Sequence, residues 1–196
     1  MNYPSGIKKS INNNTSNINH QNISHKNRGM TLENEINESN DYYREIKKAY
    51  IYKKPTPIKV TKVDYPSRDK AVIREAFYTV PSTTDYNGLY REKYIDFEAK
   101  ETRSKTSFAL ENIHNHQIEH IRNIHNNGGI AFLIVRFTLL NETYLLSADK
   151  FLNYIDKEKR KSITIDYFRK EAHQIKDGLR PIIDYLKIVD ELIGGK

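Results

Sequence analysis

The sequence predicts an α/β domain whose central mixed β-sheet is flanked by helices. Helical and strand patterns follow one another in the order helix, strands, helix, strands and helices. Residues 130–137 are nearly all apolar, as expected for a strand buried on both faces of a sheet. The 196 residues, 37% hydrophobic and 29% charged, are typical of one globular domain with a sizeable core.

The chain begins with a segment that predicts no fold. Residues 1–27 are rich in Asn, Ser, His and Lys, so we predict a disordered tail before a folded domain at 28–196. Thr31 is a suitable N-cap, and apolar side chains recur at helical spacing up to about Lys48, which predicts the first helix. Residues 49–53 then have the pattern of a strand, which Pro55 and Pro57 end.

Two β-prone runs, residues 58–65 and 71–80, follow this strand. One interpretation is a pair of ordinary strands whose charged faces meet water. The other is an extended basic hairpin, inserted at about 58–79, that projects from the domain as a stalk. Phe77 and Tyr78 near its base either pack in a core or stack on exposed bases. The runs and their connection carry Lys59, Lys62, Arg68, Lys70 and Arg74.

The second half of the chain predicts a helix over 112–125, a pair of strands and three more helices. Strands are expected at 130–137 and 143–146, and helices near 149–160, 164–173 and 181–193, with Pro181 in the first turn of the last. His116 and His120 lie one helical turn apart, but no third ligand is evident in the sequence. We therefore interpret the histidines of this helix as polar-face residues that can hydrogen-bond to phosphate.

The segment at 94–100 is the most informative for chemistry. It alternates, with apolar residues on one face of a strand and Asp96, Glu98 and Lys100 on the other. If the chain turns at Arg91-Glu92 in a two-residue hairpin, Asp85 on the preceding strand lies opposite Glu98. Two carboxylates and one ammonium then converge.

This arrangement suits metal-dependent cleavage of a phosphodiester. The two carboxylates can hold one or two Mg²⁺ or Mn²⁺ ions that keep their waters and accept a substrate phosphate. Lys100 can orient or deprotonate the attacking water, or offset charge on phosphorus. The alternative is that the charges mark the solvated face of a strand. The apolar opposite face, the Asp at the hairpin register and Asn87-Gly88, where backbone can approach a ligand, favour a site.

Composition narrows the class of partner and the compartment. The formal charge of +7 favours a polyanion, either nucleic acid or an anionic membrane surface. No run approaches the roughly 18 apolar residues that span a bilayer, and the N-terminus lacks the apolar core of a signal peptide, so we expect a cytoplasmic location and no membrane partner. The absence of cysteine excludes disulfides and thiolate zinc sites.

Eight segments between residue 27 and the C-terminus carry a resemblance to a known family. They are residues 27–33, 52–57, 64–73, 82–88, 94–102, 105–108 and 116–120, and Arg180-Pro181 with Asp184-Tyr185. In these segments the chain resembles the RecU-type Holliday junction resolvases of the PD-(D/E)xK nuclease superfamily. The tail lies outside this resemblance, and the Arg91-Glu92 turn lacks the glycine that two-residue hairpins favour.

The resemblance implies a restriction-endonuclease-like core and a role for each site residue. Asp85 and Glu98 are the implied metal ligands, Lys100 the catalytic lysine, Glu33 the acid on the first helix, and Gln117 a polar residue lining the site. It also implies Mg²⁺, with Mn²⁺ as a substitute, a homodimer, and a stalk that enters the centre of a four-way DNA junction. The implied activity is paired nicking that leaves 3′-hydroxyl and 5′-phosphate ends, in homologous recombination and DNA repair.

We expect four-way junction DNA as the main partner, association with the nucleoid, and recombination and branch-migration proteins as further partners. Two other functions stay open: a nuclease with the same chemistry that acts on linear duplex, and a non-catalytic protein that binds junctions. The stalk argues against the first and the intact catalytic set against the second. The residues expected to contact DNA are Lys53, Lys54, Lys59, Lys62, Arg68, Lys70, Arg74 and Tyr78.

Overall fold

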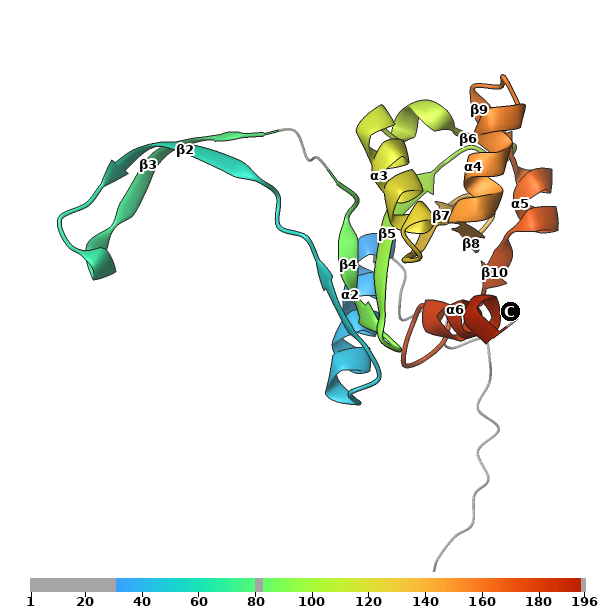
Figure 1. The fold of residues 1–196 in the computed structure, drawn as a ribbon, viewed down its shortest axis with the longest axis horizontal. Helices are drawn as coiled ribbons and strands as arrows, with labels where there is room; N and C mark the ends of the chain where they lie inside the picture. The colour runs from blue at the N-terminus through green and yellow to red at the C-terminus, as the bar shows by residue number, and fades with distance from the viewer. Residues whose placement is uncertain (1–30, 80–82, 195–196) are drawn as a thin grey trace, which may run out of the picture.

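A computed structural model describes residues 31–79 and 83–194, and its centre is a six-stranded mixed sheet with helices on both faces (Figure 1). The predicted tail at 1–27 lies outside the described residues. Only β5 and β7 are parallel, and the other neighbouring strands pair antiparallel. The predicted α/β class is therefore confirmed. In spatial order the strands are β1 (Tyr50–Lys53), β4 (Tyr86–Tyr90), β5 (Lys93–Thr102), β7 (Ile130–Phe137), β8 (Glu142–Ser147) and β10 (His173–Ile175).

The parallel pair at the centre of the sheet requires a crossover, because parallel strands cannot be joined by a hairpin. The chain makes it through β6 (Ser107–Ala109), the short 3₁₀ helix η3 (Leu110–Asn112) and α3 (Asn115–Asn126). All of β7 after Ile130 is buried, as its apolar sequence predicts. The carboxylates of β5 therefore lie on a strand inside the sheet, which holds its backbone on both sides.

Two hydrophobic cores lie on the two faces of the sheet. The first is closed by α2 (Leu32–Glu45) and α6 (Tyr185–Gly194). In it the rings of Tyr86, Phe97 and Phe132 stack across three neighbouring strands, at centroid distances of 4.8 and 4.7 Å. The second core is closed by α3, α4 (Ala148–Lys157) and α5 (Ile165–Glu171). Because Phe97 faces the first core, the residues next to it on β5 face α3.

The segment between β1 and β4 forms a separate two-stranded hairpin that projects from the domain (Figure 1). It consists of β2 (Ile58–Asp64), the 3₁₀ turn η2 (Arg68–Lys70) and β3 (Val72–Tyr78), and every residue of both strands is exposed. Of the two interpretations of this region, the stalk is the one observed. Tyr78 is 84% exposed, so it is not a core residue. We call residues 58–79 the stalk from here on.

Several helices begin or end at other residues than the sequence predicts, and the sequence analysis missed three short strands. The first helix ends at Glu45, and the helix predicted from 112 begins at Asn115. The prediction of Pro181 in a first helical turn was wrong, because α6 begins at Tyr185 after a turn in which Gly178 N–H donates to the Ile182 carbonyl at 2.8 Å. Strands β6, β9 (Ser162–Thr164) and β10 have three residues each, too few to give a period. Across residues 31–79 and 83–194, no helix is long and apolar enough to cross a membrane.

Candidate active site

The β4–β5 hairpin brings together the two carboxylates that the sequence pointed to. Its turn residues Arg91 and Glu92 have φ of 48° and 62°, the left-handed conformation that a two-residue turn of type I′ requires, although neither is glycine. The predicted register is confirmed, since the ladder reaches Tyr86 and Phe97, one step short of Asp85 and Glu98. Beyond it, the Asp85 N–H donates to Glu98 Oε2 at 3.0 Å.

A glycine allows the neighbouring strand to close on this hairpin. Gly88 pairs with Ile51 of β1, and a Cβ atom at Gly88 would lie 2.1 Å from the Tyr50 carbonyl oxygen. Any other residue would push β1 away from β4. The close approach matters for the site because β1 leads directly into Lys54, whose backbone N–H donates to the Asp85 carbonyl at 2.8 Å.

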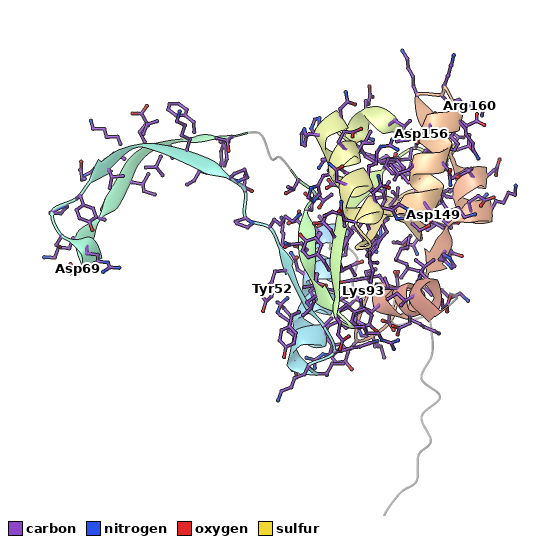
Figure 2. The ribbon with its side chains drawn as sticks, in the orientation of Figure 1. Tyr52, Asp69, Lys93, Asp149, Asp156 and Arg160 are labelled. Carbon is purple, nitrogen blue, oxygen red and sulfur yellow. The ribbon has the colours of Figure 1, made fainter. Side chains whose placement is uncertain are left out.

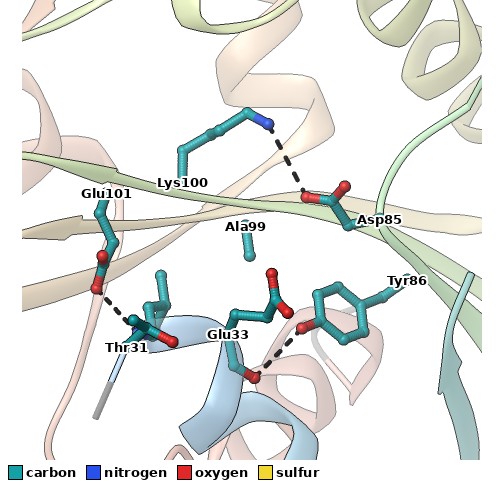
Figure 3. A pocket seen from close by; sticks show the side chains of 8 residues that line it. Thr31, Glu33, Asp85, Tyr86, Ala99, Lys100 and Glu101 are labelled. Atoms are coloured by element: carbon teal, nitrogen blue, oxygen red, sulfur yellow. Dashed lines mark hydrogen bonds and ion pairs between the residues drawn. The ribbon is translucent and has the colours of Figure 1, made fainter. Parts of the chain in front are cut away.

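Glu98 is a fully buried carboxylate held between a cation and a second carboxylate. The Lys100 ammonium pairs with Glu98 and lies 3.9 Å from Asp85 Oδ2 (Figure 3 shows the latter contact). Burial, and after it the negative charge of Asp85, raises the pKa of Glu98 to about 7, which the Lys100 charge partly opposes. When Asp85 and Glu98 are both ionised, their two negative charges therefore exceed the single positive charge of Lys100.

These carboxylates fit a divalent cation. Glu98 Oε1 is buried and accepts no well-formed hydrogen bond from the described residues, although the Lys100 ammonium lies against it. Asp85 is more open, with 37% of its side chain exposed. Carboxylate oxygens are the ligands that Mg²⁺ prefers, and Mg²⁺ usually keeps several waters. No group of three or more His, Cys, Asp or Glu residues suited to a metal occurs in the described part of the chain.

A cleft of about 440 Å³ opens beside this pair, and the N-terminus of α2 forms one wall (Figure 3). Glu101, at the end of β5, accepts the Leu32 N–H at 2.9 Å and so holds the first turn of α2. Glu33 lies in that turn, lines the cleft and pairs with Lys53. The lining residues are Thr31, Leu32, Glu33, Asp85, Tyr86, Ala99, Lys100 and Glu101.

The other predicted site residues divide between the interior and the surface. Gln117 is buried on α3, where its Oε1 accepts the His114 N–H at 3.0 Å, and it is not among the residues that line the cleft. Lys54, expected to contact DNA, turns inward, with its ammonium 2.8 Å from Asp96. The residues of the stalk that we expect to contact DNA are exposed. Figure 2 labels Asp69 at the end of the stalk that lies away from the domain.

The sequence missed two acids that organise the site. It placed Asp96 on the face of Glu98 but gave no sign that this carboxylate is buried and contacts Lys54, just after β1, and His120 of α3. Glu101 did carry a signal, because it is a charge on the otherwise apolar side of β5, after Ile95, Phe97 and Ala99. Its contact with Leu32 explains that position.

Comparison with known proteins places these features in a family. The family model "Recombination protein U" (RecU) matches residues 27–191. The Holliday junction resolvase RecU of Staphylococcus carnosus is 50% identical, over 98% of this chain and 96% of its own length. The protein of the same name from Geobacillus kaustophilus is 53% identical, over 85% and 84%. A solved Holliday junction resolvase, Hjc of Archaeoglobus fulgidus, covers 66% of this chain and 88% of its own at 9% identity, with a TM-score of 0.38.

Proposed function

This chain belongs to the Recombination protein U family, and from that premise we propose that it is a Mg²⁺-dependent endonuclease that resolves four-way (Holliday) DNA junctions. Its curated relatives, matched over nearly their whole length, are named as Holliday junction resolvases. The observation that carries the proposal is the convergence of Asp85, Glu98 and Lys100 beside a cleft, next to a projecting basic hairpin.

The chemistry follows from the charges at the site. A bound divalent cation supplies Lewis-acid polarisation of the scissile phosphate. Asp85 and Glu98 would hold such a cation, and Lys100, paired with Glu98, would offer its N–H groups to the attacking water and to the phosphate oxygens. Water attacks phosphorus in line, the bond from phosphorus to the 3′-oxygen breaks, and a 3′-hydroxyl and a 5′-phosphate result.

The cleft also gives Glu33 a place in this scheme. Its side chain lines the cleft, is 53% exposed and pairs with Lys53. Approach of a phosphate would compete for Lys53 and release the Glu33 carboxylate toward the metal site. Lys53 is therefore an expected DNA contact that is linked to the cleft through Glu33.

The stalk supplies selectivity for a branched substrate in this proposal. A hairpin with both faces exposed suits insertion into the open centre of a four-way junction, where its cations meet phosphates from several strands and Tyr78 stacks on a base. Two chains related by a dyad would present two sites to the two opposed strands and so make paired nicks. The product would serve homologous recombination and DNA repair.

The test is cleavage of a mobile synthetic four-way junction against linear duplex of equal length, with Mg²⁺ or EDTA. We expect the wild type to make symmetric paired nicks in the junction with Mg²⁺ only, and Asp85→Asn to make none. Asp156→Asn is the matched control, because Asp156 is a surface carboxylate paired with Arg122. Preferred cutting of linear duplex would show that duplex DNA, and not the four-way junction, is the substrate. Junction binding without cutting would favour a non-catalytic protein.

A further inference from the structure

A second carboxylate on β5, Asp96, is fully buried two residues before Glu98 and has no part in the chemistry proposed above. It faces four side chains. The Lys54 ammonium lies 2.8 Å away, the Tyr94 hydroxyl donates at 3.0 Å, and His120 Nε2 lies at 3.2 Å. The Thr84 hydroxyl donates to its other oxygen. A buried charge is tolerated only when it is paired and hydrogen-bonded, and this set meets that requirement.

Two of these partners are the places where the stalk joins the domain. Lys54 directly follows β1 and precedes residues 55–57, which lead into β2. Thr84 stands where the chain re-enters the sheet, after residues 80–82, which lie outside the described part of the chain. One buried carboxylate therefore binds both roots of the stalk, and each root binds through its side chain.

One of these roots, Lys54, and the carboxylate of Glu98 hold the backbone of Asp85 in place. The Lys54 N–H donates to the Asp85 carbonyl at 2.8 Å from the side of β1. The Asp85 N–H donates to Glu98 at 3.0 Å from the side of β5. Asp96 thus binds residues on both sides of Asp85, namely the side chain of its neighbour Thr84 and the side chain of its backbone partner Lys54.

We propose that Asp96 and Lys54 are positioning residues that clamp the two roots of the stalk and thereby fix Asp85 opposite Glu98. The direction of the stalk and the spacing of the two metal-binding carboxylates are then set by one network. A junction seated on the stalk presents its strands to carboxylates already at the correct separation. This inference rests on the proposed nuclease function for its catalytic consequence, but the clamp itself is a property of the folded chain.

The first test replaces Lys54. Lys54→Met keeps the length and the apolar stem of the side chain but removes the ammonium, and Lys54→Arg restores a cation. The control is Lys150→Met, because the Lys150 ammonium pairs with Glu171 at the same 2.8 Å far from the site. If Lys54→Met does not fold, Thr84→Val removes the other root's hydroxyl within nearly the same volume.

Single-turnover junction cleavage at saturating protein separates positioning from stability. We expect Lys54→Met to slow cleavage by about 10- to 100-fold, as removal of a residue that orients a metal ligand typically does, with Lys54→Arg recovering most of the rate. Junction affinity in EDTA should stay close to that of Lys150→Met, whereas the Tm of Lys54→Met should fall, because the buried Asp96 loses its cation. Cleavage rates are therefore compared at a temperature well below the Tm of every variant. Equal cleavage rates in Lys54→Met and wild type would overturn the proposal.

A second readout does not depend on activity. The chain has no cysteine, so Asp69→Cys at the stalk tip and Asp149→Cys on α4 can carry a spin-label pair (Figure 2). The labelled protein is diluted with unlabelled protein, and the distance between the two spin labels is measured. We expect one narrow distance distribution when the labelled protein has no further substitution or carries Lys150→Met, and a broader distribution when it carries Lys54→Met. An unchanged distribution in Lys54→Met would refute the clamp. A wild type that keeps the narrow distribution but cuts no junction would instead refute the proposed nuclease function.

Discussion

The backbone N–H of Asp85 donates to the side chain of Glu98 at 3.0 Å, so the Glu98 carboxylate orients the backbone that carries the Asp85 carboxylate. This contact predicts that a substitution at Glu98 can remove the negative charge and still keep the hydrogen bond to Asp85. Glu98→Gln keeps an oxygen that can accept from Asp85 but loses the negative charge. We expect the fold and the junction affinity to hold, since phosphate contacts dominate binding, and cleavage to fall at least ~100-fold.

Junction cleavage and binding in parallel measure this separation. Glu158→Gln is the matched control, because Glu158 is an exposed carboxylate paired only with Arg160 among the described residues. Cleavage by Glu98→Gln at the wild-type rate would show that the site is misassigned. A loss of affinity equal to the loss of rate would show instead that Glu98 acts mainly in binding.

The raised pKa of Glu98 predicts that metal binding depends on pH. Because this pKa is about 7 without metal, Glu98 is largely protonated below neutral pH and must lose its proton when Mg²⁺ binds. Apparent Mg²⁺ affinity should therefore fall as pH drops below 7, by up to about tenfold per pH unit, and level off above it. Titration calorimetry in two buffers of different ionisation enthalpy measures the proton released. Affinity that is constant from about pH 6 to pH 8 would contradict this assignment.

The stalk should be separable from the fold of the domain. None of the buried residues of the described chain lies between 58 and 79, and the Thr79 N–H donates to the Pro57 carbonyl at 3.1 Å, so a short Gly-Ser turn can replace the stalk. We expect this deletion to leave the melting transition of the core intact and to abolish preferential binding to four-way junctions over linear duplex. Gel-shift titration with both DNAs measures the preference. Junction affinity retained by the deletion would show that the branch is recognised elsewhere.

The β4–β5 hairpin was predictable because its strand faces and its turn are visible in a short stretch of sequence. Alternation over 94–100 gave the faces of β5, and the two-residue turn gave the register that brings Asp85 to Glu98. The stalk was partly predictable, since its strands and turn are visible in the sequence, whereas their separation from the sheet was resolved only through the family resemblance.

What escaped prediction depends on contacts between distant segments. Asp96 shares a face with Glu98 and Lys100, but the sequence does not reveal that Asp96 is buried and contacts Lys54, just after β1, and His120 of α3. The inward turn of Lys54 has the same origin. A lysine next to a basic hairpin suggests a DNA contact, but the side chain is instead drawn to a buried carboxylate 42 residues away.

A buried ion pair between α2 and β7 gives a prediction about stability. Glu35 and Arg136 are 4% and 8% exposed, and they pair directly. Burial raises the pKa of Glu35, while its hydrogen bond to Arg136 lowers it. Arg136→Met removes that opposing influence and leaves a buried carboxylate without its cation, which should destabilise the domain by about 3–5 kcal/mol near neutral pH.

The pH dependence of this loss has a definite sign. Without Arg136, the pKa of Glu35 rises further, so the folded variant favours the neutral acid. The free energy of unfolding is lowered only at a pH where Glu35 would be charged, because only the charged carboxylate is costly to bury. The destabilisation should therefore be largest at about pH 8 and smaller at about pH 5, as measured by urea unfolding. Arg169→Met, which breaks the exposed pair with Glu142, should cost no more than about 1 kcal/mol at either pH. If Arg136→Met cost as little as this control, Glu35 would not depend on Arg136 for its burial.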